Sequence, residues 1–338
     1  MIKPNFQKAI FFLFTIIIFI SCHSKNNVKD LSSGIPVDQI AVLTEKISKD
    51  VNNAELFDAR AKLYLAVNKI NDALSDISKA IQIDEKKPDY YLTLSDIYLA
   101  MNQITKCQDA IGKAISLSPQ HVDSYLKLAE LNLYLKKYDE THKNADKAIE
   151  IQELTPKAFF IKGFAYKEAG DSTKAVLFFQ KTIQIEPDYY DAYMQLGLML
   201  SNQKNRNAID YFNSALNLKP KSIEAYYALG MYQQENNNPD AAIKAYQSII
   251  TIDSTYKQAY YNIGYVYLEY KYSYPEAVKS FSKAIDVDKN YVEAYYNRGY
   301  TYELMKEVAK ARSDYKTAMG LRTNYQKAIE GLNRLDKK

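Results

Sequence analysis

The chain has 338 residues, among them 31 tyrosines and no tryptophan, but only ten glycines and nine prolines. So few helix-breaking residues over such a length disfavour a sheet protein and favour a long all-helical chain. Lys and Arg total 44 against 40 Asp and Glu, and the two signs are well mixed along the sequence. This near-neutral balance lacks the basic footprint of a nucleic-acid-binding protein, so we expect no nucleic-acid partner.

The first residues have the pattern of a targeting segment. Lys3 and Lys8 precede an apolar run over 9–20 that is interrupted only by Thr15. A basic start followed by a twelve-residue segment that is apolar except for Thr15 predicts a secretory signal peptide over 1–21, and the segment is too short for a spanning helix of ordinary length. The alternative is a short transmembrane anchor.

The four residues that end this run, Phe-Ile-Ser-Cys at 19–22, resemble a bacterial lipobox with phenylalanine in place of the usual leucine. The resemblance implies that Cys22 is lipidated and anchors the chain to a membrane of the bacterial cell envelope. His23 follows it, not the aspartate that retains some lipoproteins at the inner membrane, which favours the outer membrane, facing the periplasm. The polar stretch 22–36 cannot bury enough apolar surface to fold, and we expect it to be a tether.

Aromatic residues recur at nearly constant spacing through the rest of the chain. Intervals of 33 to 35 residues separate Phe57, Tyr91, Tyr125, Phe159, Tyr193, Tyr226, Tyr260 and Tyr295. A small residue lies four positions after each of them, at Ala61, Ser95, Ala129, Gly163, Gly197, Gly230, Gly264 and Gly299. Two more columns made mostly of small residues start at Ala73 and Ala80. Four columns that stay in register through eight units indicate a repeat architecture.

This pattern resembles the tetratricopeptide repeat, with tyrosine or phenylalanine where that family often has tryptophan. The resemblance covers 54–325 and implies an all-α, right-handed α-solenoid of about eight helical hairpins. The residues agree with it. Within Ala225–Gly230, large and small side chains at i, i+3 and i+4 form one apolar helical stripe. One hairpin cannot bury such a stripe alone, but stacked neighbours can.

The segments on either side of the repeats are predicted to be capping helices. The N-terminal segment, 37–53, carries Ile40, Leu43 and Ile47 at helical spacing, and the lysine-rich segment 326–338 closes the other end. Terminal elements with a polar outer face are what a solenoid needs to remain soluble.

Groups that perform catalysis or bind metals are scattered. The three histidines, His23, His121 and His142, have no metal-ligand spacing, and Cys107 occupies a small-residue column where a buried space-filling role is expected. Repeats and caps account for 37–338. We therefore predict no enzyme activity, no catalytic residues, no metal site and no cofactor.

A second face of the first helix in each repeat is more informative about function. Positions one and five residues after the column aromatic point roughly 100–140° away from it, and in tetratricopeptide arrays this face lines the concave groove. In the first three units these positions are polar or aliphatic. From the fourth unit onward they are Phe160, Phe164, Met194, Leu198, Tyr227, Met231, Tyr261, Tyr265, Tyr296 and Tyr300.

Two interpretations of these residues are open. In the first, they complete the core between neighbouring hairpins. In the second, they form a groove that binds an extended peptide or a partner's helix, since aromatics give large contact area at small entropic cost. In the second case Asn262 and Asn297, at equivalent places, could hydrogen-bond a peptide backbone. We expect a lipid-anchored scaffold or adaptor that binds protein partners in an envelope assembly or secretion complex. The alternative is an adaptor that stacks glycan rings on the aromatics.

Overall fold

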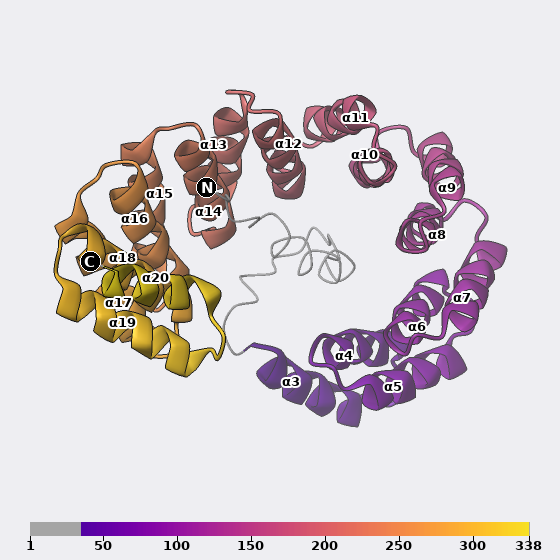
Figure 1. Cartoon of the computed structure of the whole chain (residues 1–338). Coiled ribbons are helices and arrows are strands. Elements are labelled where there is room, and N and C mark those ends of the chain that lie inside the picture. Colours follow the sequence, from indigo (N-terminus) through magenta and orange to yellow (C-terminus); the bar gives the residue numbers. More distant parts are fainter. Residues whose placement is uncertain (1–34, 338) are drawn as a thin grey trace. The chain divides into compact units, whose positions relative to one another are not determined.

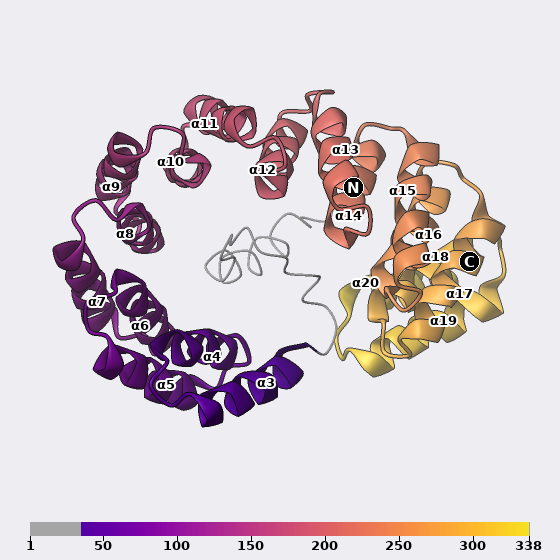
Figure 2. The ribbon, with the colours of Figure 1, turned by 180° about the vertical axis from the view of Figure 1, so that it is seen from behind.

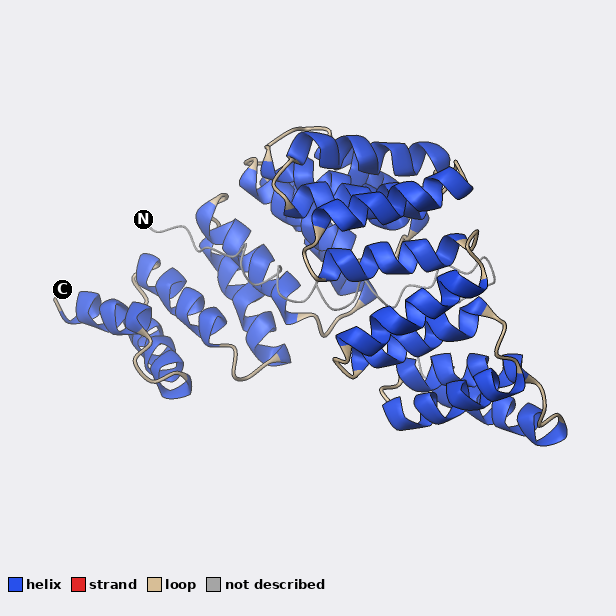
Figure 3. Ribbon diagram, turned by 90° about the vertical axis from the view of Figure 1, so that its right-hand side faces the viewer, coloured by secondary structure: helices blue, strands red, loops and turns tan. Residues whose placement is uncertain are grey.

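The computed structural model describes residues 35–337, and within these residues the chain is built of helices joined by turns, without strands (Figures 1 and 3). The predicted all-α repeat fold is confirmed. The helices are α3 (Ile35–Lys49), α4 (Ala54–Ala66), α5 (Ile70–Ile83), α6 (Pro88–Ala100), α7 (Ile104–Leu117), α8 (Val122–Tyr134), α9 (Tyr138–Ile151), α10 (Pro156–Glu168), α11 (Ser172–Ile185), α12 (Tyr190–Asn202), α13 (Ala208–Leu218), α14 (Ile223–Glu235), α15 (Pro239–Ile252), α16 (Lys257–Glu269), α17 (Tyr274–Val287), α18 (Val292–Leu304), α19 (Val308–Leu321) and α20 (Gln326–Asp336).

Helices α4–α19 form eight consecutive pairs, one for each predicted repeat. We call the even-numbered first helix of a pair the A helix and the odd-numbered second helix the B helix. The predicted signal peptide, Cys22 and nearly all of the predicted tether lie outside the described residues. Among the residues that are described, no helix has both the length and the apolarity that a bilayer span requires.

The chain divides into two compact units within α11, unit 1 over Met1–Phe178 and unit 2 over Phe179–Lys338. In unit 1, α4, α6 and α8 each contact the next A helix as well as their own B helix. A helices therefore form one layer and B helices a second, which Figures 1 and 2 show for α4–α9 from opposite sides. In unit 2, neighbouring A helices make the same contact at α12 with α14 and at α16 with α18.

Every turn from an A helix to its B helix has one residue in the left-handed conformation. These residues are Asn68, Asn102, Lys136, Gly170, Lys204, Asn237, Tyr272 and Lys306. A left-handed residue after the last helical turn is the usual way to end a helix, and glycine or asparagine adopts it most easily. Six of these turns are three residues long, and those at 203–207 and 270–273 are longer but keep the left-handed residue.

The column of small residues lets the A and B helices of one hairpin approach closely. A Cβ added to Gly230 would lie 2.6 Å from the ring of Tyr246, and one added to Gly264 would lie 2.8 Å from the ring of Phe281. Both rings belong to B helices and are fully buried. In the first repeat, where the B helix carries Ile77 in place of a ring, Ala61 fits. The size of the small residue follows the size of the side chain it faces.

Two arginines at matching places join three helices each. Arg298 donates through Nε and Nη2 to both oxygens of Asp314 in α19 at 2.7 Å, and through Nη1 to Ser282 Oγ in α17 at 3.0 Å. Arg60 makes the equivalent bonds to Asp76 in α5 and, at 2.9 Å, to Thr44 in α3. Since Thr44 takes the place of Ser282, α3 occupies the position of a B helix that lacks its A helix.

The opposite end is closed by α20, which packs on α18 and α19 in the position of a ninth A helix. Arg334 of α20 donates to both carboxylate oxygens of Glu303, at 3.1 and 2.9 Å. By repeat spacing, the residues that would face a missing partner are Gln39 and Lys46 in α3 and Asn333 in α20, and all three are exposed. Polar residues replace the small columns where the solenoid ends, as capping requires.

Candidate binding face

In unit 2, tyrosine pairs link α14 to the start of α16, α16 to the start of α18, and α18 to the start of α20. The residue one place after the column aromatic packs its ring against a tyrosine that directly precedes the following A helix. The pairs are Tyr227 with Tyr256 at 6.5 Å, Tyr261 with Tyr291 at 5.2 Å and Tyr296 with Tyr325 at 5.7 Å between ring centroids. We call this surface of α14, α16 and α18, together with the turns before α16, α18 and α20, the tyrosine face.

The second tyrosine of each pair was missed in the sequence. Tyr256, Tyr291 and Tyr325 are spaced by 35 and 34 residues, so they form a further repeat column. The signal was present, but it lies just before each A helix and outside the apolar stripe. Turn residues are not expected to pack, and here they do.

The predicted groove residues differ in burial. Those buried are Phe160, Phe164, Met194, Tyr261, Asn262 and Asn297. Those half-buried are Leu198, Tyr227, Met231, Tyr265, Tyr296 and Tyr300. Phe160 and Phe164 lie in α10 of unit 1, with ring centroids 4.9 Å apart, and the others lie in unit 2. The half-buried residues are the ones whose side chains a partner could contact.

The two predicted asparagines differ from each other. Asn297 Nδ2 donates to Tyr261 Oη at 2.7 Å, and both side chains are buried, so this amide links α18 to α16. Asn262 Nδ2 is buried and has no hydrogen-bond partner. The same position in unit 1 again connects neighbouring A helices, because Thr93 Oγ1 donates to Asp58 Oδ1 at 2.6 Å.

The corresponding surface of unit 1 is occupied by ion pairs between A helices. Lys127 Nζ lies 2.9 Å from Asp96 and 3.4 Å from Glu130, and Lys157 Nζ lies 2.7 Å from Glu130. Burial disfavours the ionised form of Glu130, but the two lysines outweigh it and lower its pKa. Burial prevails at Asp96 and raises its pKa despite Lys127. These charges neutralise one another within the protein.

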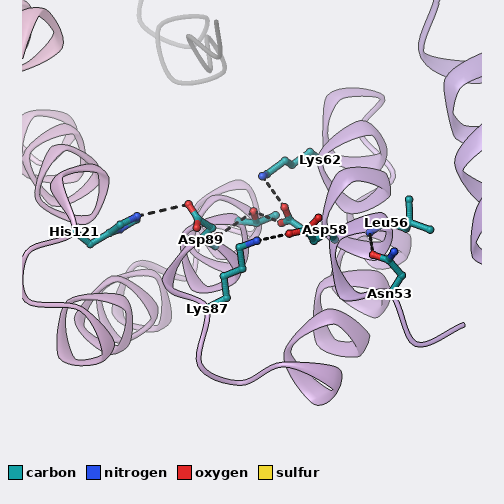
Figure 4. A network of polar contacts seen from close by, with 9 residues as sticks. Asn53, Leu56, Asp58, Lys62, Lys87, Asp89 and His121 are labelled. Atoms are coloured by element: carbon teal, nitrogen blue, oxygen red, sulfur yellow. Dashed lines mark hydrogen bonds and ion pairs between the residues drawn. The ribbon is translucent and has the colours of Figure 1, made fainter. Parts of the chain in front are cut away.

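Figure 4 shows the N-terminal part of this network, where Lys62 pairs with Asp58 at 2.7 Å. Beside it, the residue preceding an A helix contacts the acid in the first turn of the previous A helix. Lys87 lies 2.6 Å from Glu55, and His121 Nε2 lies 3.7 Å from Asp89 one repeat later. Each contact joins consecutive hairpins at the same place.

One of these junctions has the composition of a cation site, although the sequence predicted no metal. The ligand atoms of Asp89, His121 and Asp123 all lie within 4.8 Å of one another. His121 Nδ1 is hydrogen-bonded to Ser124 Oγ at 2.9 Å, which orients the ring. The three side chains could hold a divalent ion. The equivalent junction one repeat earlier has Lys87, so the contact does not depend on a metal.

The A helices of the two units differ in charge. In unit 1 they carry seven acidic and six basic residues. In unit 2, α12, α14, α16 and α18 carry six acidic residues, Asp191, Glu224, Glu235, Glu269, Glu293 and Glu303, and only two basic ones. The two bases, Lys257 and Arg298, are paired with Asp288 and Asp314. The A helices of unit 2 are therefore both tyrosine-rich and acidic.

Comparison with protein-family models finds the same repeat at five places. A model described as tetratricopeptide repeat matches residues 88–121, 223–256 and 292–330. A second model of that description matches 157–189, and one described as TPR repeat matches 273–306. Each match begins in or just before an A helix or B helix of the structure. No curated protein matches the sequence.

Solved structures with similar folds include a MamA protein, 25% identical over 52% of this chain and 96% of that one, with a TM-score of 0.47. A tetratricopeptide repeat protein from Parabacteroides merdae ATCC 43184 is 16% identical and covers 74% of this chain and 99% of its own, with a TM-score of 0.48. YrrB, described as a TPR protein with an unusual peptide-binding site, is 21% identical over 56% of this chain and 98% of its own, with a TM-score of 0.37.

Proposed function

The chain belongs to the tetratricopeptide repeat family, and from this we propose that it is a lipid-anchored scaffold of the bacterial envelope whose tyrosine face binds a protein partner. A stack of helical hairpins offers a long surface of side chains and supports a role in protein interaction. No catalytic function is part of the proposal. Partner binding by this face would recruit other components of an envelope assembly or secretion complex.

The observation that carries the proposal is the partial exposure of the side chains on the tyrosine face. Tyr265, Tyr296 and Tyr300 are half-buried, so their rings are held by neighbours on one side and are accessible on the other. Rigid, partly exposed tyrosines are typical of the residues that contribute most to protein interfaces. In unit 1 the equivalent surface is occupied by internal ion pairs, which leaves unit 2 as the better candidate.

The anchor and location rest on the N-terminal sequence. We propose that Cys22 carries the lipid and holds the repeats near the outer membrane, on its periplasmic side. Mass spectrometry of the mature N-terminus tests this, because a lipidated Cys22 is the expected first residue. A chain that still begins at Met1, or that partitions into membranes equally well after Cys22→Ala, would exclude the lipid anchor.

The choice of variant for a partner test follows from burial. Tyr261 is buried and hydrogen-bonded to Asn297, and Tyr296 packs on Tyr315 at 5.8 Å, so substituting either would disturb the fold. Tyr265 and Tyr300 are half-buried and suit the test better. Tyr272 is 70% exposed in a turn and serves as the control.

We expect wild type and Tyr272→Ser to capture the same defined protein after cross-linking in intact envelopes. The variant with Tyr265→Ser and Tyr300→Ser should lose that protein while keeping its helical circular dichroism. Unchanged capture by the double variant would exclude the tyrosine face as the partner site. Capture that survives protease digestion of the envelope but not glycosidase treatment would indicate the glycan-binding alternative.

A further inference from the structure

The ends of α14 and α16 combine aromatic rings and carboxylates in a way that identifies the chemistry of a ligand. Tyr265 and Tyr270 lie 6.4 Å apart with their rings edge to face, and both are half-buried. Burial and then the carboxylate of Glu269 raise the pKa of Tyr265. Burial and then Glu235 raise that of Tyr270. Glu269 lies one helical turn after Tyr265 and directly before Tyr270, and Glu235 is the last residue of α14.

Within the described residues 35–337, the two acids have no basic partner. Glu235 and Glu269 are exposed, and neither forms an ion pair within the part of the chain that the structure describes. The nearest lysine along the chain, Lys271, is paired with Asp240 at 2.5 Å. Partial burial alone raises the pKa of Glu269. A cationic group placed here would relieve this cost and gain the attraction of both carboxylates.

The protein's own C-terminal helix shows what the tyrosine face accepts. Lys327 of α20 lies over the ring of Tyr296, and Arg334 lies over the ring of Tyr300, each 5.8 Å from the ring centroid. A cation over an aromatic face within about 6 Å is attracted by the ring quadrupole. One hairpin earlier, Tyr265 and Tyr270 are rings of the same kind with acids nearby, and the next A helix, α18, has no lysine and a single arginine, Arg298, which is paired with Asp314.

We propose that the C-terminal ends of α14 and α16 bind lysine or arginine side chains of a protein partner, through the rings of Tyr265 and Tyr270 and the carboxylates of Glu235 and Glu269. The inference rests on the proposed function and specifies its ligand as a basic polypeptide segment. An acidic polysaccharide would be repelled by the same carboxylates.

An array of immobilised random-sequence peptides tests this, with the purified full-length lipoprotein in detergent as the probe. Bound peptides should be enriched in lysine and arginine over the whole array, and binding should weaken as salt is raised, because the contacts are between exposed charges. Enrichment in glutamate and aspartate, or no charge preference at all, would overturn the inference.

The variant Glu235→Gln with Glu269→Gln should weaken binding to the selected basic peptides at least about tenfold, which corresponds to about 1.4 kcal/mol. Glu168→Gln is the matched control, because Glu168 has the same repeat position in α10 of unit 1 and is also exposed. It should leave binding unchanged. Equal losses in both variants would show that only net charge matters and would contradict a built site.

Two further results separate this inference from the proposed function. If spermidine competes as well as the basic peptides do, the site takes small polyamines and the polypeptide assignment is wrong. If a partner cross-links to the tyrosine face yet the array shows no preference for basic peptides, the charge inference fails while the proposed function stands. Loss of both would remove the tyrosine face as a binding surface.

Discussion

Two carboxylates that share one lysine respond to burial in opposite ways. Glu130 contacts Lys127 and Lys157, and its pKa is lowered, whereas Asp96 contacts Lys127 alone and its pKa is raised by burial. The difference is the second cation. With an additional lysine from the next A helix, ion pairing outweighs desolvation, so the pKa of the carboxylate is lowered instead of raised.

This difference predicts the pH dependence of stability. Because the folded pKa of Glu130 is lowered, its contribution is present above the unfolded value of about 4.3 and is lost as pH falls through the folded pKa. Glu130→Gln should therefore be less stable than wild type at neutral pH and should lose less stability on acidification. Urea midpoints measured from pH 7 to pH 3 check this.

Asp96→Asn is the control of opposite sign. With a raised folded pKa, ionised Asp96 reduces stability once the pH exceeds the unfolded value of about 3.9, so its removal should not lower the neutral-pH midpoint as Glu130→Gln does. Parallel pH curves for wild type and Glu130→Gln would contradict the assignment of the ion pair as stabilising.

At the scale of the helix pair, the close approach of A and B helices depends on glycines facing rings. Gly230→Ala should destabilise the protein, because a Cβ 2.6 Å from the buried Tyr246 ring forces repacking. Overpacking costs about 1–3 kcal/mol and exceeds the gain in helix propensity of about 1 kcal/mol. Thermal or urea unfolding measures the difference.

Gly112 provides the comparison. It lies within α7, and an added Cβ would have nothing within 4 Å. Gly112→Ala should therefore raise stability by about 0.5–1 kcal/mol through helix propensity alone. If both substitutions were stabilising, the glycine column would not reflect close packing against the rings.

The helices themselves were predictable because the repeat length and the spacing of apolar residues determine where they lie. The 34-residue columns placed every hairpin between 54 and 325, and the helical spacing of Ile40, Leu43 and Ile47 predicted a helix that the structure forms as α3 (Ile35–Lys49). The hydrogen bonds by which Arg60 joins three helices were not predictable. It depends on which of several polar residues in α3 and α5 meets the guanidinium, and spacing along one helix does not determine contacts between three.

The candidate site was only partly predictable for the same reason. The spacing predicted that Tyr265 and Tyr300 lie beside the core stripe, and both are half-buried. It could not tell that Tyr261 is buried and bonded to Asn297, since both belong to the same helical face in sequence. Whether the predicted groove residues bind a ligand stays a prediction, and burial now indicates which of them to test.

For the whole molecule, the distribution of charge is uneven although the total is close to neutral. The A helices of unit 1 are balanced, and those of unit 2 have an excess of acids. Composition averaged over the chain conceals this, because the compensating bases lie on other elements. This distribution and the half-buried tyrosines that accompany it support the proposal that the A helices of unit 2 bind the partner.

The most direct test is site-specific photo-cross-linking in living cells, with the cross-linker in place of Tyr265 on the tyrosine face or of Lys279 on the B helix α17. Both side chains are accessible, half-buried at 265 and exposed at 279. A protein adduct of defined mass from position 265 and none from position 279 is the predicted result. Adducts from position 279 alone would show that the partner binds the B helices and would contradict the account.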